Sequence, residues 1–302
     1  MKKQLQFTTL FLLAMIITRA QKPEAAQLLV HYKFTHVKDT TNRSHPYTEN
    51  MVLYLGKTAG AYWSYDRIAA DDQFKKAWNA AVANSPDGHV MINRRGAGTS
   101  SEYYQYPNDQ KLFTKESIMG NSYLIESPIP AINWEISNDT ASFGGLHCQK
   151  ATGHFKGRDY IVWFCPELPL HIGPWKLNGL PGVIVDAHDT KNEVVFRFDG
   201  IEKASSDKST KVGDPNAPEK ELPPILRGLN YDPNLIQPPA SAIHTTQKEF
   251  DQLKETMRKD PRGFAQAVSN ANAANGIKMD VAIGKPVAEP VFNNPIELPE
   301  HK

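Results

Sequence analysis

The chain has 302 residues, and its 34 lysines and arginines are balanced by 33 aspartates and glutamates, which gives a formal net charge of +1. This balance provides no electrostatic bias toward nucleic acid, anionic lipid or acidic polymers, so we expect no nucleic-acid partner. The length suits one substantial domain, or one domain plus an appendage.

Residues 1–20 have the pattern of an export signal peptide. Lys2 and Lys3 precede an apolar run over residues 7–17, and Ala20 ends the expected cleavage site. The apolar run is shorter than the roughly 17–25 residues of a membrane-spanning helix, so a membrane anchor is the weaker alternative. No later apolar run is long enough to cross a membrane. We therefore expect an exported chain with no transmembrane span after signal cleavage.

Residues 27–202 are expected to form an antiparallel β domain. In residues 28–37, Val30, Tyr32 and Phe34 fall on one face and polar residues fall on the other, which is the period of a half-buried strand. Further strand candidates are rich in Tyr, Trp, Val and Ile and are separated by turn-forming residues. These candidates are residues 51–55, 61–65, 103–106, 122–126 and 131–136.

One helix is predicted among these strands, over residues 70–83. Its apolar residues recur at helical spacing from Phe74 to Val82, with Trp78 between them. Asp71 and Asp72 suit the positive end of the helix, and the Asn-Ser-Pro sequence at 84–86 ends it. We expect this helix to pack on the sheet with Trp78 in the core.

The composition changes after residue 202. Residues 203–243 are rich in Ser, Lys, Asp, Glu and Pro, which indicates a linker or exposed loop. Residues 244–275 are expected to form a helical hairpin, in which Thr246 and Glu249 make a capping box and Asp260 precedes a proline at the second helix start. Residues 276–302 hold several prolines and few large apolar residues, which indicates an extended or disordered tail.

A tight hairpin is predicted at Lys156 and Gly157, because Gly157 supplies the positive φ of a two-residue turn. Counting outward along the two strands places Cys148 opposite Cys165. Their α-carbons would then lie about 4.5 Å apart in a non-hydrogen-bonded pair, within reach of a disulfide. An even cysteine count in an exported chain favours this bond, and two separate buried thiols are the alternative.

Residues 166–182 carry four prolines and show no clear periodicity. Pro181 and Gly182 suit the two central positions of a type II turn, followed by a strand over 183–185 that pairs with 194–198. A loop of this length either carries function or crosses between parts of a sheet.

These residues also carry a family resemblance. Residues 179–184 read Gly-Leu-Pro-Gly-Val-Ile, and the segments at 148–152, 157–158, 163–164 and 173–176 fit the same pattern. The chain thus resembles the GLPGLI family of exported proteins from Gram-negative bacteria over roughly residues 28 to 200. Val183 stands where the family name has leucine. The resemblance implies a place in the periplasm or outer envelope and an outer-membrane receptor as a partner, and it supplies no catalytic residues.

The residues around the proline loop give structural and binding candidates. We assign structural roles to Cys148, Cys165, Gly157, Gly179, Pro181 and Gly182, and candidate binding roles to His171, Trp175, Lys176, Asp186 and His188. Asp186 and His188 share one strand face and form the best two-ligand metal fragment. The four histidines at 147, 154, 171 and 188 lack helical metal-ligand spacing, so solvated polar residues are the default. We predict no metal and no cofactor.

The predicted fold is mainly β: a curved antiparallel sheet or open barrel with one inserted helix and two C-terminal helices, and a β-sandwich is the alternative. The sequence contains no Gly-x-Ser-x-Gly elbow for acyl transfer, so its catalytic residues are unknown. The leading hypothesis is a non-enzymatic envelope protein that binds or assists a partner, either an outer-membrane receptor or an apolar small ligand. The alternative is a metal-dependent or other hydrolase that uses His171, Asp186 or His188.

Overall fold

The computed structural model describes residues 22–85, 97–205, 226, 228–229, 231–274 and 291–300, so the predicted signal peptide lies outside the described residues. In chain order the elements are β1 (Glu24–Ala25), β2 (Leu28–His36), β3 (Tyr47–Leu55), β4 (Gly60–Ser64), α1 (Tyr65–Ala83), β5 (Glu102–Tyr106), the short 3-10 helix Pro107–Asp109, β6 (Lys111–Ile118), β7 (Asn121–Pro128), β8 (Trp134–Phe143), β9 (Leu146–Phe155), β10 (Arg158–Cys165), β11 (Val183–Asp189), β12 (Val194–Lys203), β13 (Leu235–Ile236), β14 (Ile243–Thr245), α2 (Gln247–Lys259) and α3 (Pro261–Ala274).

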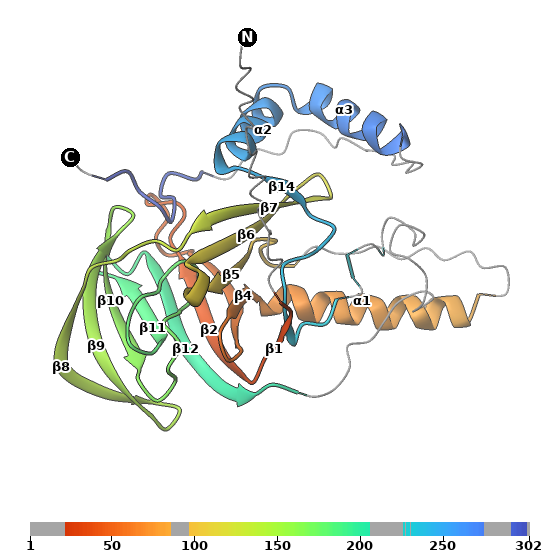
Figure 1. The fold of residues 1–302 in the computed structure, drawn as a ribbon. Coiled ribbons are helices and arrows are strands. Elements are labelled where there is room, and N and C mark those ends of the chain that lie inside the picture. Colours follow the sequence, from red (N-terminus) through yellow and green to blue (C-terminus); the bar gives the residue numbers. More distant parts are fainter. Residues whose placement is uncertain are drawn as a thin grey trace, which may run out of the picture.

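Twelve of the described strands form one curved, open sheet in the order β14-β7-β6-β5-β4-β3-β2-β12-β11-β10-β9-β8. Neighbouring strands are antiparallel except for β14, which runs parallel to β7 at one edge. Figure 1 shows α1 on one side of the sheet and the pair α2 and α3 beside β7. The predicted mainly β fold with a curved sheet and few helices is confirmed. The alternative of a β-sandwich, which requires two packed sheets, is not what these twelve strands form.

The central strands are covered on both faces. Val30 and Tyr32 of β2 belong to the main core with Phe34 packed against it, so the predicted alternation of β2 is confirmed. Residues of the opposite face, among them Val52 and Trp63, form a second core. This second core is closed in part by Ile236 of β13, which lies outside the twelve-stranded sheet.

The predicted hairpin is confirmed at the predicted residues. Lys156 and Gly157 both have positive φ, 52° and 70°, as a two-residue type I′ turn requires. Arg158 of β10 therefore pairs with Phe155 of β9, and the register continues to Phe164 opposite Gln149. The next pair, Cys148 and Cys165, is joined by a disulfide, with α-carbons 4.2 Å apart.

The proline loop of residues 166–182 does not cross the sheet, because β10 and β11 are antiparallel neighbours. Instead this loop, which we call the plug, folds onto the concave face of the sheet. Its side chains Ile172, Trp175, Leu177 and Leu180 are all buried in the main core. The loop is held there by two backbone bonds, from Val183 N to Leu168 O and from Ile184 N to Ile172 O.

The predicted type II turn at Pro181 and Gly182 is wrong. Gly182 N donates to Leu180 O, two residues back, which makes a tighter three-residue turn. Val183 N is not free to close a type II turn, because it donates to Leu168 O. Gly182 is required for a different reason: a Cβ there would lie 2.3 Å from the carbonyl oxygen of Cys165. Pro181 is exposed, and Gly179 N donates to His171 O.

Helix α1 and strands β6 and β8 differ from what the sequence predicted, and β8 runs over Trp134–Phe143 rather than over residues 131–136. Helix α1 begins at Tyr65 rather than at residue 70, because the side chain of Ser64 caps it by accepting a hydrogen bond from Arg67 N. The apolar stripe of α1 is narrow: Phe74 is buried with Trp78 packed against it, whereas Val82 is 48% exposed. Strand β6 was not predicted, since polar residues at 114–117 obscure its alternation.

The C-terminal third adds two helices and a docked segment. The capping box of Thr246 and Glu249 starts α2, and the Asp260 carboxylate accepts a hydrogen bond from Gly263 N at the start of α3. Both helices pack on β6 and β7 through Phe250 and Phe264. The region predicted as a linker, 203–243, contains strand β13, which pairs with β1.

The part of the tail that the structure describes, residues 291–300, is extended and lies against the sheet; we call it the C-terminal strap. Asn293 N and Asn294 N both donate to Lys38 O, and Leu298 N donates to Lys156 O. In Figure 1 the strap, in dark blue, lies beside the loop that follows β2.

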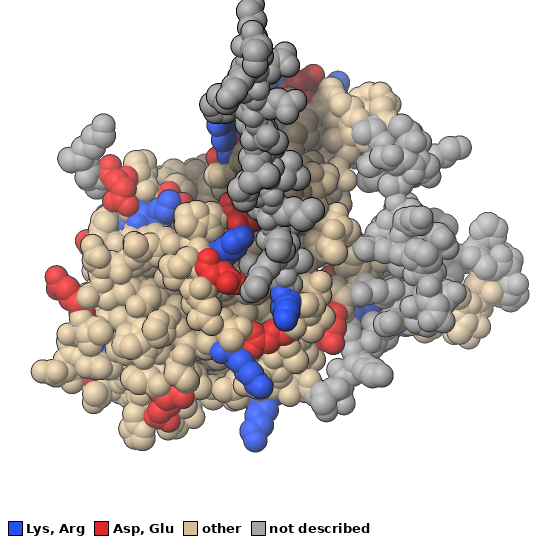
Figure 2. All heavy atoms as spheres, in the orientation of Figure 1, with Lys and Arg blue, Asp and Glu red and all other residues tan. Residues whose placement is uncertain are grey.

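Two surface properties follow from the described residues. No helix among them is both long and apolar enough to cross a membrane. On the face drawn in Figure 2, basic and acidic side chains of the described residues are interspersed rather than gathered by sign.

The disulfide should contribute substantially to stability, since it closes a segment with a sequence separation of 17. Loop-closure entropy predicts that the variant with both Cys148→Ser and Cys165→Ser loses about 3 kcal/mol of unfolding free energy. Urea denaturation of both proteins under non-reducing conditions measures this loss. Equal stability of the two proteins would contradict the prediction.

Candidate functional site

The concave side of the sheet holds a cavity of about 470 Å³, which we call the aromatic cavity. Strands β2, β3, β4, β5 and β12, the proline loop and the C-terminal strap all contribute to its walls. Seven of its fifteen lining residues are Phe, Tyr or Trp, namely Phe34, Tyr47, Tyr62, Tyr103, Trp175, Phe196 and Phe292, and the others are His36, Lys38, Glu49, Met51, Gly98, Thr99, Ser101 and Ile296. A cavity of this size and lining is typical of a small-molecule site.

The strand period explains why these side chains converge. Phe34 and His36 are two residues apart on β2, and Tyr47, Glu49 and Met51 are spaced by two on β3, so each set points to one face. The register pairs Phe34 with Glu49 and His36 with Tyr47. Antiparallel pairing thus places the two sets side by side on the concave face.

Glu49 is the buried acidic group of the cavity, at 2% exposure. Its carboxylate accepts hydrogen bonds from the Tyr47 hydroxyl and from Thr99 N, both at 2.6 Å. The backbone amide of Thr99 is therefore already used in a hydrogen bond to Glu49.

The aromatic wall contains an unpaired hydroxyl and a residue with positive φ. The Tyr62 hydroxyl is buried and has no hydrogen-bond partner, although an unpaired buried hydroxyl is costly. Trp175 has a φ of +56°, which a bulky residue rarely adopts. The Trp175 ring stacks on Phe196 at an interplanar angle of 13°, and Gln105 Nε2 donates to the carbonyl of Trp175. Strained backbone of this kind clusters at functional sites.

The C-terminal strap forms one wall of the cavity and is held by Arg158. The Arg158 side chain is only 2% exposed. Its Nε donates to Ile296 O and its Nη2 donates to Asn294 Oδ1 and Pro295 O. Its Nη1 forms ion pairs with the buried Asp189 and Glu193 at 2.6 and 3.2 Å.

The two carboxylates that face Arg158 have partners of their own. Asp189 Oδ1 accepts hydrogen bonds from Glu193 N and Val194 N, which closes the turn between β11 and β12. Although burial opposes it, hydrogen bonds from Arg43, Arg158 and Asn294 hold the pKa of Glu193 below its usual value. Each charge in this cluster therefore has an opposite charge or a donor beside it.

His36 connects the strap to the cavity. Its Nε2 lies 2.7 Å from Asn294 O, so Nε2 carries the proton that is donated to this carbonyl. Burial lowers the pKa of His36, and the charges of Lys38 and Arg158 act in the same direction, while the bond to Asn294 and the charge of Asp189 oppose them.

The five candidate binding residues from the sequence do not form one site. Trp175 lines the aromatic cavity. Lys176 pairs with Glu297 of the strap at 2.5 Å. His171 is exposed on the loop. The aromatic cavity is not lined by His171, Asp186 or His188.

Asp186 and His188 do share a strand, but Asp186 is fully buried and already satisfied. It accepts hydrogen bonds from Phe198 N and from Arg197 at the point where β11 and β12 diverge. Burial raises the pKa of Asp186, against the opposing effect of these bonds, and burial together with the charge of Arg197 lowers the pKa of His188.

The remaining histidines have separate partners. His147 pairs with Glu167, and His154 lies between Asp159 and Glu300. In the ranges that the structure describes, no group of three His, Cys, Asp or Glu residues is arranged to hold a metal ion.

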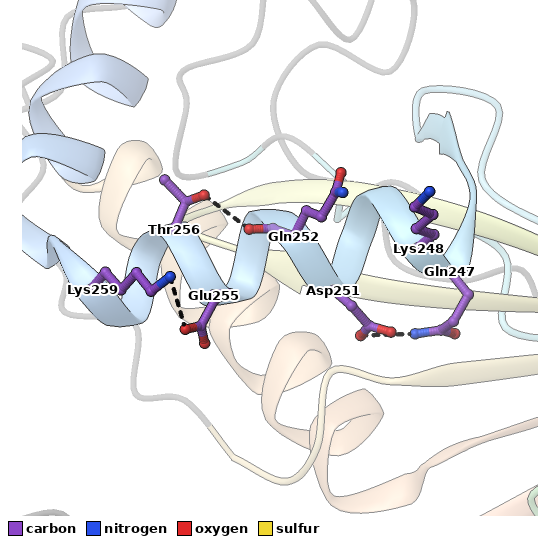
Figure 3. Close-up of a pocket in the computed structure, with 7 residues that line it drawn as sticks. All are labelled: Gln247, Lys248, Asp251, Gln252, Glu255, Thr256 and Lys259. Atoms are coloured by element: carbon purple, nitrogen blue, oxygen red, sulfur yellow. Dashed lines mark hydrogen bonds and ion pairs between the residues drawn. The ribbon is translucent and has the colours of Figure 1, made fainter.

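A second hollow, of about 1010 Å³, lies on the surface of α2 and is not a built site. Figure 3 shows that all seven residues drawn come from this one helix, and that several pair with each other. Gln247 donates to Asp251, Thr256 donates to Gln252 O, and Lys259 pairs with Glu255. These contacts stabilise an exposed helix and leave no converging polar groups for a ligand.

Comparison with known proteins shows no family for this chain and only weak structural similarity. The sequence matches no protein-family model and no curated protein. Two structures of PNGF-II, in the P21 and C2 space groups, are similar to part of the chain. The first is 10% identical with a TM-score of 0.42, and the match covers 60% of this chain and 29% of that chain. The second is 8% identical with a TM-score of 0.46, and the match covers 75% and 32%. This chain thus spans about a third of those chains, and so weak a likeness carries no argument about its function.

Replacement of Arg158 should destabilise the protein strongly, because Asp189 and Glu193 would remain buried without their shared cation. We expect Arg158→Met to lower the unfolding free energy by about 3–5 kcal/mol. Arg43→Met is the matched control: Arg43 also pairs with Glu193, but its side chain is 51% exposed, so its loss should cost about 0–1 kcal/mol. Urea denaturation compares the two variants, and similar losses in both would contradict the central role of Arg158.

The lowered pKa of His36 predicts a pH dependence of stability. As the pH falls below the ordinary value of 6.5, the unfolded chain takes up a proton that the folded His36 resists. His36 therefore contributes stability above pH 6.5 that is lost as the pH falls toward its lower folded pKa. We expect His36→Gln to reduce the loss of unfolding free energy between pH 7 and pH 5. The exposed His45→Gln is the control, and an equal reduction in both variants would contradict the assignment to His36.

Proposed function

We propose that this protein is an exported cell-envelope protein, similar to the GLPGLI family, that binds a small ligand of largely apolar character in the aromatic cavity. Its role is binding or accessory rather than catalytic, and its place is the periplasm or outer envelope of a Gram-negative bacterium. An outer-membrane receptor is the partner that the resemblance suggests. The single observation that carries the proposal is a cavity of about 470 Å³ walled by seven Phe, Tyr and Trp side chains.

Two further observations support a ligand in this place. The Tyr62 hydroxyl lacks a partner in a chain whose other cavity groups, such as Glu49, are hydrogen-bonded. The strained backbone of Trp175 presents its ring to the cavity, and strain of this kind persists where function requires the geometry. Conversely, the residues on which the hydrolase alternative depends lie away from the cavity, so no observation favours a catalytic role for them.

A neutral apolar probe tests the proposal. The fluorescence of N-phenyl-1-naphthylamine should rise saturably with the wild-type protein, because the aromatic cavity removes the probe from water. Ser101→Trp places an indole at the cavity wall and should weaken binding at least tenfold. Thr140→Trp, on the exposed part of β8, is the matched control and should bind like wild type.

Two results would contradict the proposal. Absence of saturable binding, or equal binding by Ser101→Trp and Thr140→Trp, would show that the aromatic cavity is not the ligand site.

A further inference from the structure

Among the residues that the structure describes, no cation pairs directly with the buried carboxylate of the aromatic cavity. Glu49 is 2% exposed and accepts hydrogen bonds from the neutral groups Tyr47 Oη and Thr99 N. Throughout the described part of the chain, no lysine, arginine or histidine forms an ion pair with Glu49. A buried carboxylate favours a positive charge close to it.

The chain already places a cation of its own at the edge of this site. Lys38 Nζ lies 3.4 Å from the centroid of the Tyr47 ring, and the hydroxyl of the same ring bonds to Glu49. Burial lowers the pKa of Lys38, while the charge of Glu49 opposes that shift. The ammonium of Lys38 thus rests on an aromatic face in a partly desolvated position, and the flexible side chain can carry it back to water.

The rest of the cavity suits an organic cation with an apolar body. Aromatic faces attract an ammonium group more strongly where water is excluded. The unpartnered Tyr62 hydroxyl, on a side chain that is 2% exposed, can donate to or accept from a polar group on the ligand. The volume of about 470 Å³ is that of a small molecule.

We propose that the ligand of the aromatic cavity is a small, soluble organic ammonium ion, which takes the place of the Lys38 ammonium on the Tyr47 ring and has Glu49 as its counter-ion. This inference rests on the proposed function and names the ligand class. Exchange of one ammonium for another keeps the charge of the cavity balanced. Since two cations there would repel each other, Lys38 competes with the ligand.

Choline and its neutral carbon isostere, 3,3-dimethylbutan-1-ol, test the inference, because they differ only in the charge of the central atom. Each is titrated into the wild-type protein with bound N-phenyl-1-naphthylamine, and direct calorimetric titration of choline provides a second readout. We expect choline to bind about tenfold more tightly than the isostere. Glu49→Gln, which keeps an acceptor for Tyr47 and Thr99, should abolish this preference. Lys38→Met should tighten choline binding several-fold, because it removes the competing ammonium.

The other possible results would overturn the inference alone, or the inference together with the proposed function. Equal affinity for choline and the isostere, or weaker choline binding by Lys38→Met, overturns the inference and leaves the proposed apolar site intact. Absence of binding by N-phenyl-1-naphthylamine and by choline overturns both. Cosedimentation with phosphatidylcholine vesicles without a response to free choline overturns a soluble ligand and assigns the ammonium to a lipid headgroup.

Discussion

The buried guanidinium of Arg158 joins three segments that are distant in the sequence. Arg158 follows the hairpin turn directly, its carboxylate partners Asp189 and Glu193 lie in the next hairpin, and its carbonyl partners lie in the C-terminal strap. All three of its nitrogen atoms donate hydrogen bonds, so the cost of burying one positive charge is offset by two carboxylates and by the strap. The wall of the aromatic cavity depends on this contact, because the same strap carries Phe292 and Ile296.

The proline loop explains why an open curved sheet has a closed core on its concave side. Its buried side chains fill the space that a curved sheet of twelve strands leaves, and the disulfide between Cys148 and Cys165 lies where the loop leaves β10. The plug does not fill the whole interior. Trp175 of the plug stacks on Phe196, and both rings line the cavity together with Phe292 and Ile296 of the strap.

Residues close in sequence were more predictable than residues brought together by folding. The alternation of Val30, Tyr32 and Phe34 gave the correct strand face, and the Lys156-Gly157 turn gave the correct cysteine register, because both depend on local geometry. Glu49 and Tyr62 carried no such signal. Glu49 lies between Thr48 and Asn50 in the polar first half of β3, and its role depends on β2, Thr99 and the strap, which lie elsewhere in the chain.

The sequence by itself determined the β character of the chain, the hairpin, the disulfide and the caps of the C-terminal helices, since each follows from alternation, turn chemistry or a spacing of a few residues. Only the tertiary structure decided that the proline loop is a plug, that residues 291–300 are a docked strap, and that aromatic side chains from five strands, the plug and the strap surround one cavity. The physical reason is that the curvature of the sheet and the burial of Arg158 are properties of the whole packed chain, and no local pattern of residues encodes either.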